Sequence, residues 1–306
     1  MKFGLALPHY GFSWPDHGRV TFERIAEVAR EAERLGFDSL WVSDHFYLSV
    51  AKYGAGDDLH DALEPMTTIA SLIPVTERVQ LGTLVLSMPF RHPAVLARQA
   101  RTLDALSGGR VQLGVGSGWY EDEFVDLGYD FGTTGSRFAA LDEGLKVLRE
   151  EGAPRVFVGA KGGPRALRSI ARNADGWNAV WKLTPDSYAE RVRDLERICE
   201  EEGRDPSSVR RSVGLYTLVG QDERDLVERF LAMQRWTPNG ALDGELLEDW
   251  ARDTLTGTPQ QVLDTVGAFA GLGVDEMIIC PSSLPFAISQ MDSLELFATE
   301  VIPAAS

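Results

Sequence analysis

The 306-residue sequence has little cysteine, no long apolar run and a deficit of positive charge. Its only cysteines, Cys199 and Cys280, show no metal-ligand spacing, so we expect two free thiols in a cytoplasmic protein rather than a disulfide framework. No apolar run approaches the roughly 20 residues that span a bilayer. The apolar run at the start is interrupted by Pro8 and is too short for a signal peptide. These absences predict a protein without a membrane partner.

The chain also lacks the charge and the motifs of several other protein classes. Acidic residues outnumber basic ones by 46 to 30, which gives a formal net charge of −16. Such a surface repels phosphate backbones and anionic lipids, so we predict no nucleic-acid partner. The five histidines form no H-x-H or H-E-x-x-H pair, which argues against a metal hydrolase. We therefore predict no metal site.

What the sequence does contain is a regular alternation of short apolar runs and longer segments with helical spacing. Near-continuous apolar runs are typical of strands buried on both faces of a parallel sheet. Such runs occupy residues 3–8, 39–43, 79–87, 111–116, 156–160, 176–180, 212–220 and 276–280. The spacing between them predicts helices at about 22–35, 64–74, 93–107, 137–151, 164–173, 185–202, 258–271 and 291–301.

Strands and helices in this order predict a (β/α)8 barrel, with residues 1–306 as one domain. The alternative is a doubly wound open sheet, which usually has a glycine-rich phosphate-binding turn after its first strand. Residues 8–18, "PHYGFSWPDHG", provide no such turn. The segment at about 221–257, after the seventh strand, is too long for a simple connection. We predict a helical insertion there, serving as a lid or a subunit contact.

The second predicted strand ends abruptly in two polar residues, Asp44 and His45. In (β/α)8 barrels the chemistry lies at the carboxyl ends of the strands, so both side chains should lie at the barrel mouth. The competing interpretation is a structural strand-end cap with a hydrogen-bonded histidine. The other strand ends supply few titratable groups. Such a mouth suits a cofactor that brings its own chemistry.

Two glycine-rich stretches support a cofactor site. The first, "GVGSGW" at 114–119, ends the fourth strand, and its missing side chains let a ring or its tail approach the backbone. In the second, the fifth strand runs into Gly162 and Gly163, and Pro164 stands where the first helical residue should be. The free N–H groups of a helix N-terminus form an anion site, so we predict phosphate binding there rather than a plain turn. Basic residues surround this helix start: Lys161, Arg165, Arg168 and Arg172.

Over nearly its whole length the chain resembles the bacterial luciferase-like family, the flavin- and deazaflavin-dependent barrel oxidoreductases. The resemblance is carried by "GFDSLWVSDHF", "RVQLGTLVLSMPFRHPAVLARQARTLDALSGGRVQLGVGSGW", "VFVGAKGGP" and "GTPQQVLDTVGAFAGLGVDEMIICP". The stretch "VSDHF" and the third-strand segment resemble the branch that uses coenzyme F420, a 5-deazaflavin. They are less similar to the monooxygenases that use flavin mononucleotide (FMN).

The resemblance implies a role for individual residues. His45 would be catalytic and lie near the reacting ring carbon, and Asp44 would contact the deazaflavin. The bond between Leu84 and Val85 aligns with a non-proline cis peptide that backs the ring, and Ser87 would contact the coenzyme beside it. The remaining implied contacts follow the ribityl chain and the phosphate: Gly116, Ser117, Gly118, Ala160, Lys161, Gly162, Gly163 and Arg165.

The sequence departs from one group within the family. The sugar-phosphate dehydrogenases have a glutamate after the Gly-x-Gly turn and a tryptophan four residues after the histidine. Trp119 and Ser49 occupy these positions here, which argues against glucose 6-phosphate as the substrate. The resemblance also implies a homodimer, to which apolar residues of 64–73 would contribute.

The leading functional hypothesis is a coenzyme F420-dependent oxidoreductase that transfers a hydride to or from a small organic substrate. The first alternative is an FMN-dependent monooxygenase, which activates dioxygen on the reduced flavin. A deazaflavin passes hydride but reacts poorly with oxygen, so the two differ by cofactor. A further alternative is a non-catalytic barrel that binds a flavin.

Overall fold

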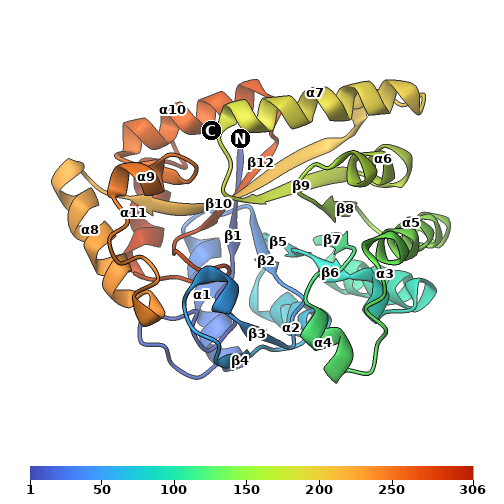
Figure 1. Ribbon diagram of the computed structural model, residues 1–306, viewed down its shortest axis with the longest axis horizontal. Coiled ribbons are helices and arrows are strands. Elements are labelled where there is room, and N and C mark those ends of the chain that lie inside the picture. The colour runs from blue at the N-terminus through green and yellow to red at the C-terminus, as the bar shows by residue number, and fades with distance from the viewer. Residues whose placement is uncertain (306) are drawn as a thin grey trace.

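The computed structural model describes residues 1–305, and within them eight parallel strands close into a barrel (Figure 1). Each strand pairs with the next in chain order, and the last pairs with the first. The barrel strands are β1 (Lys2–Ala6), β2 (Ser39–Val42), β5 (Gln80–Thr83), β7 (Val111–Gly116), β8 (Val156–Gly159), β9 (Gly176–Trp181), β10 (Arg210–Val219) and β12 (Glu276–Cys280). The predicted (β/α)8 barrel is confirmed.

Helices surround the barrel, and prolines mark where several of them begin. They are α1 (Phe22–Arg34), α2 (Pro65–Leu72), α3 (Pro93–Ser107), α5 (Thr134–Glu150), α6 (Pro164–Asn173), α7 (Pro185–Glu201), α10 (Pro259–Gly271) and α11 (Asp292–Glu300). Proline suits a first helical position because its fixed φ matches the helix and its missing N–H is not needed there. The two ends of the chain meet, because the Met1 ammonium donates to the Ala305 carbonyl at 3.1 Å.

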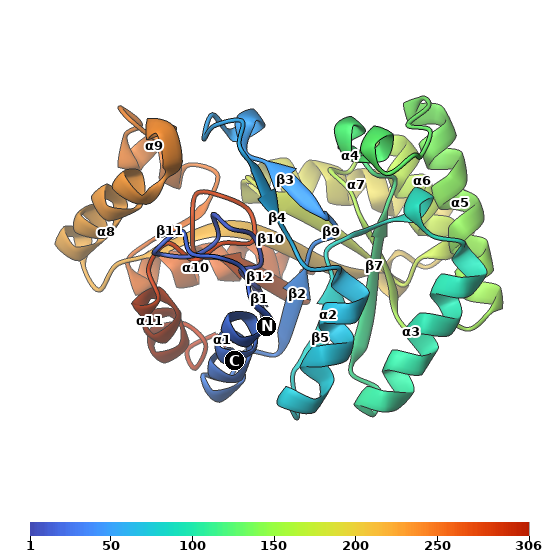
Figure 2. The same cartoon turned by 90° about the horizontal axis from the view of Figure 1, so that it is seen from below.

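Several short elements at the barrel mouth escaped sequence prediction. A hairpin of β3 (Tyr47–Ser49) and β4 (Leu59–Asp61) follows β2, and the short helix α4 (Glu121–Asp126) follows β7. Elements of three to six residues are too short to show a hydrophobic period. Figure 2 shows the hairpin and α4 on one side of the barrel, away from both termini.

The segment after β10 is helical, as predicted. It contains α8 (Glu223–Trp236) and α9 (Leu247–Ala251), followed by β11 (Leu255–Gly257), which adds to β10. Hydrogen bonds attach it to the mouth loops. Among them, Trp236 Nε1 donates to the Trp14 carbonyl at 2.9 Å, and Asn239 Nδ2 donates to the Ala55 carbonyl at 2.8 Å. The insertion therefore packs on the end of the barrel where the strands finish.

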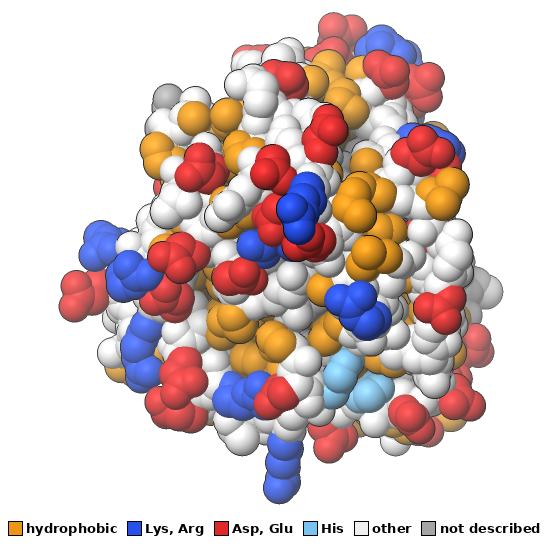
Figure 3. Space-filling view, turned by 90° about the vertical axis from the view of Figure 1, so that its left-hand side faces the viewer, with side chains coloured by type: hydrophobic (Ala, Val, Ile, Leu, Met, Phe, Trp, Pro, Cys, Tyr) orange, Lys and Arg blue, Asp and Glu red, His pale blue; other side chains and the backbone are white. Residues whose placement is uncertain are grey.

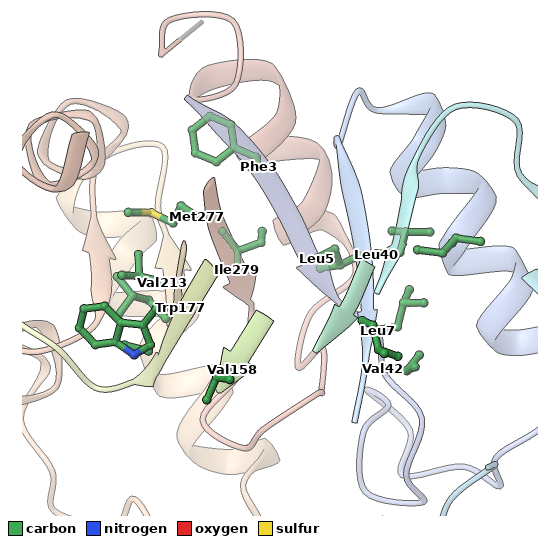
Figure 4. Close-up of a cluster of buried hydrophobic side chains, with 14 of the residues drawn as sticks. Phe3, Leu5, Leu7, Leu40, Val42, Val158, Trp177, Val213, Met277 and Ile279 are labelled. Atoms are coloured by element: carbon green, nitrogen blue, oxygen red, sulfur yellow. The ribbon is translucent and has the colours of Figure 1, made fainter. Parts of the chain in front are cut away.

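The core has an outer and an inner layer. Alternate strand residues, among them Phe3, Leu5 and Leu40, pack with the surrounding helices in the outer layer (Figure 4). Trp41 points the other way and fills the barrel interior. A Cβ atom at Gly82 would lie 2.4 Å from the Trp41 indole, so the glycine makes room for that ring.

The acidic residues that are in excess in the sequence are visible on the molecular surface. Figure 3 shows acidic side chains, with basic ones among them, over the face that carries α8. No helix within residues 1–305 is long and apolar enough to cross a membrane.

Candidate active site

The third barrel strand breaks where a cis peptide was predicted. The Leu84–Val85 bond is cis, so the predicted strand 79–87 becomes β5 and the short β6 (Leu86–Ser87). A Cβ atom would lie 2.8 Å from the Val85 side chain at Gly116 and 2.6 Å from it at Gly159. These glycines therefore accommodate the Val85 bulge, a role that the sequence analysis did not foresee. A second non-proline cis peptide, Val180–Trp181, was not predicted.

His45 follows β2 at the mouth of the barrel, and its side chain is 15% exposed. Its Nδ1 lies 2.9 Å from Glu123 Oε2. A carboxylate only accepts hydrogen bonds, so Nδ1 is the donor in this contact. Among the described residues none hydrogen-bonds Nε2. That nitrogen is therefore available to hydrogen-bond a bound molecule.

Glu123 is a candidate functional residue that the sequence did not single out. It lies on α4, its side chain is 1% exposed, and its Oε1 accepts a hydrogen bond from the Phe46 N–H at 2.6 Å. The sequence analysis noted that Trp119 replaces a glutamate found in relatives. The structure places a different glutamate against the histidine, four positions further along. Three acidic residues begin α4, and nothing in their order marks the buried one.

Asp44 is fully engaged inside the protein. Its Oδ2 accepts the Ser87 N–H at 2.7 Å, and its Oδ1 accepts Arg91 Nη2 at 2.8 Å. Arg91 also donates to Glu64 at 2.9 Å. Asp44 thus ties β2 to the segment after the bulge, and its contact with a coenzyme remains a prediction. The neighbouring Ser87 hydroxyl is buried without a protein partner, which leaves a polar atom available to a ligand.

The start of α6 has the geometry of an anion site. Gly162 has a left-handed φ of +88°, and Gly163 caps the helix with open space where a Cβ atom would lie. Lys161 forms no ion pair within residues 1–305, and Arg165 donates to the Gly135 carbonyl at 3.0 Å. Arg191 of α7 packs against Gly162 and is a third cation here, which the sequence analysis missed. Exposed helix N–H groups beside these cations suit a phosphate.

The other predicted contacts lie in the loops around this start. Ser117 and Gly118 follow β7, and the Gly118 carbonyl accepts Arg137 Nε at 3.3 Å. Ala160 follows β8, and its carbonyl accepts Trp177 Nε1 at 2.9 Å. The backbone of these loops is therefore held by side chains of the barrel and its helices.

Arg168 and Arg172, two of the basic residues near the start of α6, are paired with carboxylates. Both guanidinium groups form ion pairs with acidic residues at the end of α7, Glu201 and Glu202. The sequence placed them correctly on one helical face, but it could not show that α7 supplies their partners.

Aromatic side chains and a lysine form a wall beside His45. The ring centroids of His45 and Trp119 are 5.3 Å apart, and Tyr120 stacks on Trp119 at 5.3 Å. The Lys52 ammonium lies 3.2 Å from the centroid of the Trp119 ring. His45 therefore has an aromatic surface and a cation beside it.

A second histidine, His9, is buried beneath the mouth. Its ring nitrogens lie 2.9 Å from the Leu7 carbonyl and 2.8 Å from the Ser43 hydroxyl. Burial lowers the pKa of the His9 imidazole to about 4, so it is neutral at pH 7. His9 therefore serves as a fixed hydrogen-bonding group.

A cavity of about 520 Å³ lies between the first mouth loop and the insertion. Phe12, His60 and Trp236 are among its lining residues. No residue of the His45 region or of the α6 start lines it. The predicted site residues thus gather elsewhere on the mouth.

Comparison with known proteins gives the family. A sequence profile described as luciferase-like monooxygenase matches residues 1–151 and 135–276. The chain belongs to the luciferase-like monooxygenase family. It is accordingly an oxidoreductase with the barrel fold of that family.

Relatives within the luciferase-like family include proteins with different cofactors. An F420-dependent glucose-6-phosphate dehydrogenase of Amycolatopsis mediterranei is 42% identical over 127 residues, 41% of this chain and 36% of that protein. An FMNH2-dependent dimethylsulfone monooxygenase of Pseudomonas putida is 23% identical over 90% of this chain and 86% of its own. A solved F420-dependent secondary alcohol dehydrogenase with an F420–acetone adduct shares the fold. Its TM-score is 0.74 at 18% identity, covering 100% of this chain and 99% of that one.

Proposed function

We propose that this luciferase-like protein is a coenzyme F420-dependent oxidoreductase in which His45 exchanges a proton with a small organic substrate. The observation that carries the proposal is the hydrogen bond between His45 Nδ1 and the buried Glu123 carboxylate at the barrel mouth. Moving a hydride to or from a polar substrate usually requires a proton to move as well, and histidine suits that task near neutral pH.

Glu123 positions the histidine for this work. Its two oxygens accept from His45 Nδ1 and from the Phe46 N–H, so the carboxylate is fixed on both sides. A fixed carboxylate holds the imidazole in one tautomer and stabilises its protonated form. His45 Nε2 is then the acceptor or donor that faces a substrate.

The residues at the start of α6 fit the phosphate of the coenzyme. Lys161 and Arg191 carry uncompensated charge beside the open turn at Gly163, and the helix N-terminus adds free N–H donors. The unpartnered Ser87 hydroxyl offers a further contact near the Val85 bulge. When bound, the deazaflavin supplies the hydride chemistry, and the protein contributes orientation and the proton.

The FMN-dependent monooxygenase is the second candidate. FMN carries a phosphate at the corresponding place, so the α6 start suits either coenzyme. The observation in favour of the FMN-dependent function is the similarity to the Pseudomonas putida monooxygenase, which extends over 90% of this chain. The match to the Amycolatopsis mediterranei dehydrogenase is shorter but closer, and it supports the deazaflavin.

The test is a parallel titration of the purified protein with coenzyme F420 and with FMN, followed by absorbance. Oxygen uptake is measured after each bound coenzyme is reduced. We expect tighter binding of coenzyme F420 and no oxygen uptake beyond that of the free coenzyme. FMN binding at least as tightly, with oxygen consumed on reduction, would overturn the proposal in favour of the monooxygenase.

A further inference from the structure

The lysine on the wall beside His45 has an unusual charge environment. Acidic residues exceed basic ones in this chain, yet Lys52 has no carboxylate partner among the described residues. Its ammonium instead lies on the Trp119 ring, at 3.2 Å from the centroid, and also 5.1 Å from the Tyr53 centroid. Cation–π contacts hold a cation in place without neutralising it. Lys52 is therefore a positioned positive charge that can still bind an anion.

A second lysine provides the comparison. Lys182, which follows β9, also has its ammonium over a tryptophan, 4.8 Å from the Trp250 centroid. That ammonium, however, lies 3.6 Å from Asp253. The chain thus contains one lysine–tryptophan contact with a carboxylate and one without. In this protein a lysine that lies over a tryptophan ring can therefore also pair with a carboxylate, as Lys182 does and Lys52 does not.

Lys52 lies on an aromatic ring that also contacts His45. Trp119, on which it lies, contacts the His45 ring edge-on, so the ammonium is one indole ring away from the proton-exchanging group. Burial of the ammonium and, after it, repulsion by Lys161 lower the pKa of Lys52 to about 8. An anion between or beside two ammonium groups that repel each other would stabilise the charged form of both.

We propose that Lys52, held on Trp119, is a binding site for an anionic oxygen group, a carboxylate or a phosphate, beside His45. The group belongs either to the substrate or to the coenzyme phosphate; the assignment to these two sources rests on the proposed function, but the anion site itself does not. If the substrate supplies it, the substrate is an organic acid or a phosphate ester rather than a neutral molecule.

The experiment titrates the coenzyme-free protein with inorganic phosphate and with glutarate at constant ionic strength. Calorimetry gives the affinity. The variants are Lys52→Met and the matched control Lys182→Met. We expect saturable binding that is weakened by roughly threefold to fivefold in Lys52→Met, as for a partly exposed ion pair. Lys182→Met should bind as the unmodified protein does.

A pH series adds an independent readout. Lys52 loses its charge as the pH rises through about 8, so anion affinity should fall between pH 7 and pH 9 in the unmodified protein and stay flatter in Lys52→Met. The other titratable groups around it are Lys161, which repels it, and the phenol of Tyr53. Tyr120 and His45 contact the Trp119 ring. Burial raises the pKa of both phenols, so they stay neutral in this range.

A second arm distinguishes the two sources of the anion. The titration is repeated with the protein saturated by coenzyme F420, or by FMN if only FMN binds. Competition assigns the site to the coenzyme phosphate, and unchanged binding assigns it to the substrate. Equal affinities of the unmodified protein and Lys52→Met would overturn the anion site in either arm. Failure of both coenzymes to bind, with Lys52-dependent anion binding intact, would reject the proposed function alone.

Discussion

At the scale of single residues, the histidine was predictable and its partner was not. His45 stands out in the sequence because it directly follows a buried strand of a barrel. Glu123 is one of three consecutive acidic residues, and only the fold buries it against His45. A sequence pattern shows where a strand ends. A contact between residues 78 positions apart depends instead on how two mouth loops pack.

The pair gives a prediction about catalysis. Glu123→Gln keeps the shape of the side chain but removes its charge, so we expect turnover to fall by about 10- to 100-fold. His45→Ala should cost about 100-fold or more. Both variants should bind the coenzyme within a few-fold of the unmodified protein, which separates a catalytic defect from a folding defect. Glu121→Gln, on the same short helix but exposed, is the control. Normal turnover of His45→Ala would return the residue to a structural cap.

The buried His9 gives a prediction about stability. Its pKa is lowered from 6.5 to about 4 by burial, so between these pH values the unfolded chain binds the proton and the folded one does not. The stabilisation is complete above pH 6.5 and is lost as the pH falls toward 4. We expect the free energy of unfolding to drop by about 2 kcal/mol between pH 7 and pH 5 from this group.

The measurement for His9 is urea unfolding at pH 7 and pH 5. His9→Gln should flatten the pH dependence, whereas the exposed His92→Gln should retain it. An unchanged slope in His9→Gln would show that other groups cause the acid sensitivity.

At the scale of elements, periodicity located the regular structure well. The bounds of α3 and α6 match those read from the sequence, and the eight predicted strands all exist. Prolines at helix starts and continuous apolar runs are local features of the sequence, so they can be recognised without knowledge of the fold. The hairpin β3–β4 and α4 depend on packing at the mouth instead. Gly116 of the fourth strand was assigned to the coenzyme, but it also makes room for Val85, as does Gly159 of the fifth strand.

This packing gives a prediction that tests the bulge without any ligand. In Gly159→Ala the new methyl group would lie 2.6 Å from the Val85 side chain, so we expect a loss of about 1–3 kcal/mol in unfolding free energy. Gly159→Ala should cost less unfolding free energy when it is added to Val85→Ala than when it is added to the unmodified protein. Gly267→Ala, on α10 with no atom within 4 Å, should be neutral or stabilising by about 0.5–1 kcal/mol. Additive losses in the double variant would argue that the two residues do not compete for space.

At the scale of the whole molecule, the predicted homodimer remains a prediction. Met66, Ile69 and Leu72 of the segment 64–73 are buried in the chain's own core, whereas Ala70 is exposed and Ile73 partly exposed, so only the latter two could contribute to an interface. The neighbouring α3 exposes Val95 and Leu106, at 54% and 67%. Light scattering at micromolar concentration should give about twice the 33.7 kDa mass of the chain. A mass of one chain would contradict the dimer.

The central claim is that this barrel of the luciferase-like family works with a deazaflavin. The most direct measurement is to produce the protein in a host that makes both flavins and coenzyme F420, and to identify the bound chromophore by its absorbance. Lys161→Met, at the predicted phosphate contact, is produced alongside it. We expect coenzyme F420 to be retained by the unmodified protein and to be depleted in Lys161→Met. Retention of FMN in place of coenzyme F420 would contradict the claim.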